Sequence, residues 1–217
     1  MAGQAKVEPT LIEKGDAVSV ERLAIPPNAR QEFDKGEEAL KANQPDDAAK
    51  YLQKAIKLYG NYPDAYCLLG DAYLQSHDLK NAETSLKKSI ELEPKIAATH
   101  IDLGAVQNQL KDYPGAEASL KEGLELSPDA AGAKYELAKT YWAMGRWDDA
   151  APLAQQAVAA LPTIASARVL FGNILLKQRN AAGALEQYQE YLRLEPNGAM
   201  APSVQDLVNK IQKALHK

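Results

Sequence analysis

The chain has 217 residues, of which 46% are hydrophobic and 25% charged, a composition that supports a sizeable buried core. Its formal net charge of -4 at pH 7 argues against nucleic acid as a partner, because phosphate recognition needs a basic surface. The single cysteine, Cys67, excludes an intrachain disulfide and a metal site built from several cysteines.

The first 28 residues stand apart from the rest of the chain. They hold one short apolar patch, residues 18–25, between stretches that contain glycine and proline. This segment is either a flexible leader or an extended segment that covers the first helices. Asn28, followed three residues later by Gln31, predicts the start of the first helix, because an asparagine side chain can accept a hydrogen bond from a free N–H group there.

The sequence also bears on the compartment. It contains no apolar run of the kind that a signal peptide or a membrane-spanning helix needs. We therefore expect a soluble chain with no membrane span. The sequence is compatible both with a cytoplasmic protein and with an exported protein whose leader peptide has been removed.

From residue 29 onward the sequence repeats with a period of 34 residues. Small residues recur in one column, which consists of Gly36, Gly70, Gly104, Ala138 and Gly172. A second column consists of Ala48, Ala82, Ala116, Ala150 and Ala184. A third column, near the end of each unit, consists of Gly60, Pro94, Pro128, Pro162 and Pro196. Three columns that share one period indicate five copies of a single structural unit.

Each unit has the pattern of two helices. In the second copy, Tyr66, Leu69 and Tyr73 are spaced by three and four residues, which predicts one face of a first helix. Ala82 and Leu86 indicate a second helix after a short polar break, and the proline column ends that helix because proline has no N–H to donate. We expect the two small columns to mark where the helices of a pair approach most closely.

Two regions depart from this pattern. Pro152 lies inside the second helix of the fourth copy, so we expect that helix to start late or to bend there. After the fifth copy, one apolar stripe is formed by Val204, Leu207, Val208, Ile211 and Leu215. This stripe predicts a terminal helix that covers the last repeat and presents a polar outer face.

The columns resemble those of the tetratricopeptide repeat (TPR) proteins. In the second copy the matching residues are Leu69, Gly70, Tyr73, Ala82, Leu86 and Pro94. The resemblance implies an all-α fold, a right-handed α-solenoid of antiparallel helix pairs known as the TPR superhelix. It predicts an N-terminal leader, five repeats and a C-terminal capping helix, with the boundaries 1–28, 29–62, 63–96, 97–130, 131–164, 165–198 and 199–217.

The sequence contains no constellation that indicates catalysis. Its three histidines fall on separate elements, and it has no zinc-binding histidine pair, phosphate-binding glycine loop or nucleophile elbow. Asp64 and Asp71, one helical turn on either side of Cys67, oppose formation of a thiolate, so we interpret Cys67 as a small core residue. We therefore expect no enzyme activity, no metal and no cofactor.

The resemblance implies that the first helices line a concave groove. At the matching positions we predict a peptide-binding surface formed by Glu37, Asp64, Asp71, Gln75, Ile101, Asn108, Gln109, Tyr135, Lys139, Trp142, Asn173 and Lys177. Acidic residues gather toward its N-terminal half, whereas amides, aromatic residues and lysines gather in the other half, and this polarity can orient a bound peptide. Tyr135 and Trp142 are the expected anchors, and the competing interpretation places them in the core.

We therefore expect a non-catalytic scaffold or adaptor that binds a protein or peptide segment in the groove. TPR receptors for chaperone tails bind the terminal carboxylate with a clamp of lysine, asparagine and arginine. The equivalent slots here hold either Phe33 and Glu37 or Cys67 and Asp71, followed by Leu68 and Asp102, so the clamp is not expected. The alternative is self-assembly into a homo-oligomer, in which the solenoid ends or the N-terminal segment pair between copies of the chain.

Overall fold

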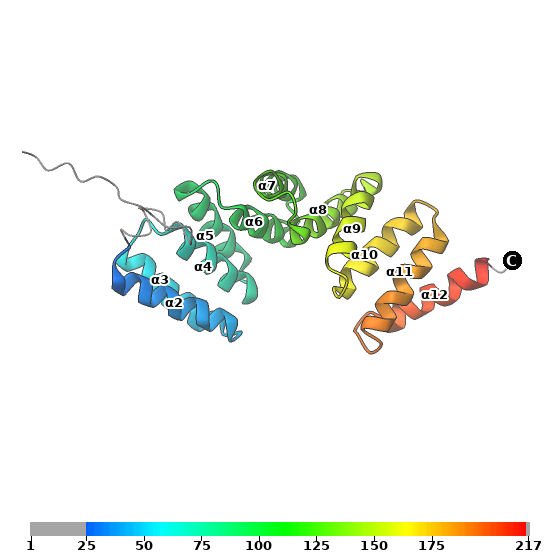
Figure 1. Ribbon diagram of the computed structural model, residues 1–217, viewed down its shortest axis with the longest axis horizontal. Helices are drawn as coiled ribbons and strands as arrows, with labels where there is room; N and C mark the ends of the chain where they lie inside the picture. Colours follow the sequence, from blue (N-terminus) through cyan, green and yellow to red (C-terminus); the bar gives the residue numbers. More distant parts are fainter. Residues whose placement is uncertain (1–24, 216–217) are drawn as a thin grey trace, which may run out of the picture.

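The computed structural model of the protein describes residues 25–215, and all regular structure in that range is α-helical (Figure 1). Almost all of the expected leader at 1–28 lies outside the described residues, as do residues 216–217. The two interpretations of the leader therefore stay predictions, and so does the exact division of the chain into repeats.

The described residues form five helix pairs followed by one further helix. The pairs are α2 (Pro27–Lys41) with α3 (Pro45–Leu58), α4 (Pro63–Gln75) with α5 (Leu79–Leu92), α6 (Ala97–Leu110) with α7 (Tyr113–Leu126), α8 (Ala131–Ala143) with α9 (Trp147–Ala160), and α10 (Ala165–Lys177) with α11 (Ala181–Leu194). The last helix is α12 (Ala201–Leu215). In Figure 1 the pairs follow one another in chain order from one end of the molecule to the other.

The protein is a helical solenoid, and its curvature follows from which helices contact one another. The first helices of successive pairs contact one another, α2 with α4, α4 with α6, α6 with α8, and α8 with α10. The second helices α3, α5, α7 and α9 instead pack between the first helix of their own pair and the first helix of the next, and α11 packs between α10 and α12. Because successive first helices contact one another, they lie on the inside of the curve. We call the surface formed by α2, α4, α6, α8 and α10 the inner face.

Each turn within a pair contains one residue in the left-handed backbone conformation. These residues recur every 34 positions, at Asn43, His77, Lys111, Gly145 and Arg179, with φ values of 56°, 60°, 63°, 74° and 62°. Only Gly145 adopts this conformation without a steric penalty, because it has no Cβ atom. The second helix then begins two residues after each of these positions.

Polar side chains fix three of the helix starts. Asp78, Asp112 and Asn180 are N-cap residues, and each accepts a hydrogen bond from the backbone N–H three residues later, at distances of 3.3, 3.2 and 3.0 Å. Such a cap satisfies an N–H group that has no partner inside the helix. The register of the second helices is thus set locally by each turn.

The helices of a pair approach most closely where the small column of the first helix meets a large residue of the second. A Cβ atom added to Gly70 would lie 2.5 Å from Cγ of Leu86. At Gly172 an added Cβ would lie 2.7 Å from Cε1 of Tyr188. A side chain at either position would force the partner residue to move, which explains why these positions are glycine.

The fourth pair reaches the same spacing with different residues. Ala138 replaces the glycine, and the residue sixteen positions later, which is Leu86 or Tyr188 in other pairs, is Ala154. Both alanines are buried in one core cluster. A smaller partner on α9 therefore makes room for the extra methyl group on α8.

The first helix begins earlier than predicted. α2 starts at Pro27, with Pro26 as its N-cap residue, so the predicted start at Asn28 is wrong. The Asn28 side chain accepts a hydrogen bond from the N–H of Ala29 at 3.0 Å. Proline is well suited to the first helical position, because its fixed φ matches the helix and it has no N–H to satisfy.

Pro152 does not delay the second helix of the fourth pair. α9 begins at Trp147, on the 34-residue register, and Pro152 lies inside it. The predicted late start is therefore wrong, and the alternative, a bend at Pro152, stays a prediction.

The last helix closes the array. Val204, Val208 and Ile211 of α12 are buried in a cluster that also contains Tyr188 and Tyr191 of α11. The apolar stripe of α12 thus packs against the fifth pair, although Leu215 at its end is 50% exposed.

Candidate functional site

The twelve residues predicted to bind a peptide lie on five first helices. They are Glu37 on α2; Asp64, Asp71 and Gln75 on α4; Ile101, Asn108 and Gln109 on α6; Tyr135, Lys139 and Trp142 on α8; and Asn173 and Lys177 on α10. Nine of them are half-buried, whereas Gln75, Gln109 and Lys177 are exposed.

A polar network joins α6 to α8 on the inner face. The Asn108 side-chain amide donates hydrogen bonds to the backbone carbonyl and to Oε2 of Glu136, at 3.0 and 3.1 Å. The Thr140 hydroxyl donates to Oδ1 of Asn108 at 2.8 Å. Asn108 is therefore held in one orientation by contacts with the next repeat.

The same network continues along α8 toward α10. The Lys139 ammonium forms an ion pair with Glu136 at 2.8 Å and lies 5.3 Å from the centre of the Tyr135 ring. The Tyr135 hydroxyl donates to Oγ of Ser166 on α10 at 3.1 Å. The inner face from α6 to α10 is thus a connected surface whose side chains are fixed by one another.

Both predicted aromatic anchors also take part in packing. Tyr135 and Trp142 are half-buried and pack against the core cluster of the third, fourth and fifth pairs. Each ring thus combines a core-facing side with a partly accessible one.

Three of the predicted residues make their principal contacts elsewhere. The Ile101 side chain packs against Gly123 of α7, where an added Cβ atom would lie 2.7 Å from Cγ1 of Ile101. The Asn173 Oδ1 accepts a hydrogen bond from the Tyr188 hydroxyl at 2.6 Å. Lys177 lies 5.0 Å from the ring of Trp147 on α9. Ile101 and Asn173 thus help to hold their own helix pairs together.

Acidic side chains occupy the other part of the inner face. Glu37 forms an exposed ion pair with Lys41 at 2.8 Å. Asp71 of α4 lies beside Asp102 of α6, and one ligand atom from each of these carboxyls and the sulfur of Cys67 fall within 4.8 Å of one another. The Cys67 thiol donates a weak hydrogen bond to Oδ2 of Asp102 at 3.9 Å.

The protonation of this group follows from burial and crowding. Burial and, to a smaller extent, the neighbouring Asp71 carboxyl together raise the pKa of Asp102 to about 8. Burial also raises the pKa of Asp71, to about 6. The pKa of the Cys67 thiol is raised to about 12, chiefly by burial. At neutral pH the thiol keeps its proton, which makes it a poor nucleophile and a poor metal ligand.

Sequence reasoning missed two acidic residues that organise the inner face. Asp102 and Glu136 are 34 residues apart and occupy the same repeat position, one residue beyond the column that holds Ile101 and Tyr135. Their shared position and shared charge were the available signal. The sequence identified Asp102 only as a residue that does not fit the chaperone-tail clamp, and it predicted no role for Glu136.

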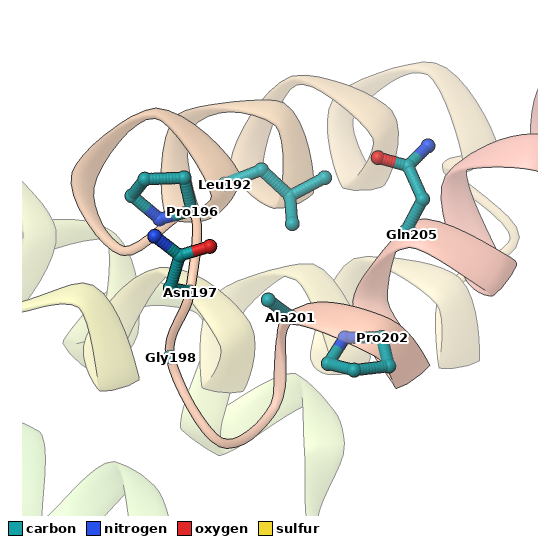
Figure 2. Close-up of a pocket in the computed structure, with 7 residues that line it drawn as sticks. All are labelled: Leu192, Pro196, Asn197, Gly198, Ala201, Pro202 and Gln205. Atoms are coloured by element: carbon teal, nitrogen blue, oxygen red, sulfur yellow. The ribbon is translucent and has the colours of Figure 1, made fainter.

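A surface pocket lies at the C-terminal end of the solenoid. It has a volume of about 430 Å³ and is lined by Leu192, Pro196, Asn197, Gly198, Ala201, Pro202 and Gln205. Figure 2 shows that it forms where the chain turns from α11 into α12. None of the predicted binding residues lines it.

Three solved structures illustrate the fold that this chain shares. MamA from Desulfovibrio magneticus RS-1 is 22% identical, covers 81% of this chain and 99% of its own, and has a TM-score of 0.69. PilF from Pseudomonas aeruginosa is 16% identical, with coverages of 87% and 90% and a TM-score of 0.71. YrrB, described as a TPR protein with an unusual peptide-binding site, is 20% identical, with coverages of 82% and 92% and a TM-score of 0.65. At these identities the similarity concerns the fold.

Comparison with curated proteins gives no significant match. Within residues 25–215, no helix combines the length and the apolar character that crossing a bilayer requires. The sequence profile of the tetratricopeptide repeat matches residues 33–92, 67–131 and 135–199, which together make up most of the chain. With its paired helices and 34-residue register, the chain belongs to the tetratricopeptide repeat family.

Proposed function

We propose that this protein is a non-catalytic interaction scaffold that binds a peptide or protein segment along its inner face. The observation that carries the proposal is the connected polar surface from α6 to α10, in which Asn108, Glu136, Lys139 and Tyr135 hold one another in place. Side chains that are already fixed lose little conformational freedom when a partner binds, so such a surface favours association.

Trp142 is the central contact of the proposed site. It is half-buried against the core and lies one turn beyond Lys139, whose side chain is 38% exposed. A partly buried aromatic ring beside an accessible cation offers apolar area and a charge to one ligand. This combination suits a peptide that carries an apolar residue next to an acidic one.

The distribution of charge gives the proposed groove a direction. Acidic residues lie on α2 and α4, and Lys139 and Lys177 lie on α8 and α10. A bound segment with basic residues at one end and acidic residues at the other would align with this field. YrrB, which has the same fold, is described as a TPR protein with an unusual peptide-binding site, and this supports a peptide as the ligand proposed here.

The two tryptophans allow a direct test. Trp147 is 37% exposed and lies on α9, so Trp147→Phe leaves Trp142 as the sole tryptophan. We would select ligands from a displayed peptide library with the wild-type chain and titrate them into the Trp147→Phe variant. A change in Trp142 emission with saturable binding is expected.

Matched variants complete this test. Trp142→Ala and Lys139→Ala should each weaken peptide binding about tenfold or more, the loss expected for an interface anchor. Trp147→Phe should bind as the wild type does. Peptides that bind all four proteins equally would place the binding surface elsewhere.

The solenoid ends favour this function over end-to-end self-assembly. At the N-terminal end, the buried Glu32 carboxylate pairs with Lys35 and Lys54 at 2.9 and 3.0 Å. At the C-terminal end, the outer surface of α12 exposes Gln205, Asp206, Asn209, Lys210 and Lys213. Polar ends of this kind make weak interfaces. A stable dimer in sedimentation experiments that is lost on deletion of residues 1–27 would favour self-assembly instead.

A further inference from the structure

The contact between α4 and α6 on the inner face is unusual because it brings two carboxyl groups together. One carboxyl oxygen of Asp71 and one of Asp102 lie within 4.8 Å of each other, and a hydrogen bond between the two groups requires a proton on one of them. They come from adjacent repeats, so this contact crosses the boundary between the second and third helix pairs. We call this contact the α4–α6 seam.

Other titratable and charged side chains around the seam do not neutralise the pair. On α4 the nearby groups are Asp64 and Cys67, and both Asp71 and Asp102 act on the thiol. Other inner-face charges on the adjoining first helices are paired with one another, namely Glu37 with Lys41 on α2 and Glu136 with Lys139 on α8. Arg30 on α2 also has an interaction partner.

The second helices packed behind the seam also use their charges elsewhere. On α3, α5 and α7 the ion pairs are Asp47 with Lys50, Glu32 with Lys54, Glu83 with Lys87, Glu91 with Lys88, and Glu117 with Lys121. None of these cations is among the causes that shift the pKa of Asp71 or Asp102. Within the described residues, the electrostatic state of the seam is therefore set chiefly by the proton that the two carboxyls share.

We propose that the Asp71–Asp102 pair is a proton-operated latch that holds the second repeat against the third. With a shared proton, the O–H···O bond joins α4 to α6. When both carboxyls ionise, two like charges face each other in a half-buried contact and the seam opens more readily. The proposal concerns the contact between repeats and does not depend on the identity of a binding partner.

The direction of the pH effect follows from linkage. The pKa values of both carboxyls are raised in the folded chain above the ordinary value of 3.8. The folded chain therefore binds more protons than the open chain between about pH 4 and about pH 8. The stability that the latch contributes is fully present below about pH 4 and is lost as the pH rises toward about 8.

Cys67 is a built-in reporter of the seam. Its side chain is 8% exposed, it contacts Asp102, and it is the only thiol in the chain. Alkylation of Cys67 requires the seam to open, so its rate relative to glutathione at the same pH measures protection of the thiol. We expect protection to fall by at least about tenfold between about pH 6 and about pH 8 and then to level off, with the helical circular dichroism signal unchanged.

Two variants and one control separate the latch from a general effect of pH. Asp102→Asn and Asp71→Asn remove the second negative charge, so protection in each should vary much less with pH. Asp206→Asn changes an exposed carboxyl on α12 and should behave as the wild type. A chelator is present throughout, so that a bound metal ion cannot supply the protection.

Either of two results would overturn the proposal. One is protection of the wild-type thiol that does not change between about pH 6 and about pH 8. The other is a pH profile in both asparagine variants that matches the wild type. Because the wild-type profile is decisive by itself, the test survives even if a variant folds poorly.

Discussion

Asp102 and Glu136 occupy the same position in consecutive repeats, yet their surroundings differ. Glu136 lies at the α6–α8 seam, where Lys139 pairs with it at 2.8 Å and Asn108 donates to it. Asp102 lies at the α4–α6 seam, beside the Asp71 carboxyl and the Cys67 thiol. One seam carries a satisfied carboxylate, and the other carries a carboxyl that depends on a proton.

The difference shows that equivalent positions in a repeat array can place side chains alike and still give them different interaction partners. The 34-residue register fixes where each acidic side chain lies, because both follow the same helix geometry. The residue three positions later is Lys139 in the fourth repeat, where it forms an ion pair with Glu136, and Ala105 in the third repeat, which offers Asp102 no charge. Equivalent positions in the array therefore differ in the partners that their carboxyl groups find.

The largest expected effect on stability concerns the buried cores of the second and third helix pairs. Ala82 and Ala116 hold the same position in the second and third pairs, and both are fully buried. Ala82→Phe and Ala116→Phe should each lower the free energy of unfolding by about 3 kcal/mol through overpacking. Ala98→Phe, at an exposed site on α6, is the control. Chemical denaturation measures the losses, and an unchanged midpoint for either buried variant would contradict the packing.

A second change breaks the satisfied seam. Asn108→Ala removes the amide that bonds Glu136 and Thr140, and should cost about 1–3 kcal/mol because the partners lose their hydrogen bonds. Gln109→Ala, the next residue, is exposed and should change stability little. Equal denaturation midpoints for the two variants would mean that the network contributes nothing to the free energy of unfolding.

A third change converts one seam into the other. Ala105→Lys places a cation three residues after Asp102, as Lys139 follows Glu136. The new ion pair should lower the pKa of Asp102 and stabilise the chain by up to about 1 kcal/mol near pH 8, with a smaller gain at acid pH. Melting temperatures measured across this pH range check the effect. Gln109→Lys adds the same charge one turn farther on, and an identical profile there would exclude a local effect.

The smallest expected effect leaves both seams intact. Lys111 adopts φ of 63° at the turn between α6 and α7, where Gly145 is found in the next repeat. Lys111→Gly should raise stability by about 0.5 kcal/mol, because glycine carries no Cβ penalty in this conformation. Thermal melting measures the gain. The pH dependence of Cys67 protection should stay as in the wild type, and a changed profile would show that the turn and the seam are coupled.

The fold could be predicted because its determinants are local and recur. Close packing of the two helices and termination of the second helix are needed in every repeat. The residues that provide them, such as Gly70, Ala82 and Pro94, therefore recur every 34 positions and can be recognised together. The missed details depend on single sites. The sequence offers two possible starts for the first helix, the Pro26-Pro27 pair and Asn28, and the structure has the first. Pro152 lies inside α9, and the sequence alone does not show that the helix can contain it.

The candidate site was harder to predict because side chains on the inner face interact across repeats. The sequence places Asn108 on the inner face, but only the structure shows it bonded to Glu136 on the next helix. Likewise, the carboxyl pair joins Asp71 to a residue 31 positions later, a spacing that no helical periodicity reveals. Helix geometry predicts the face of a residue, whereas its partners depend on how neighbouring helices are stacked.

The exchange at Ala138 and Ala154 constrains how such a chain can be recombined. If α8 were joined to the second helix of the fifth pair, the Ala138 methyl group would meet Tyr188, where even Gly172 leaves little space. If α10 were joined to α9, Gly172 would face Ala154 and leave a void. Duplication or grafting should therefore succeed when whole helix pairs are moved and fail when single helices are swapped. The helix pair is therefore the smallest unit that can be moved as a whole in this protein.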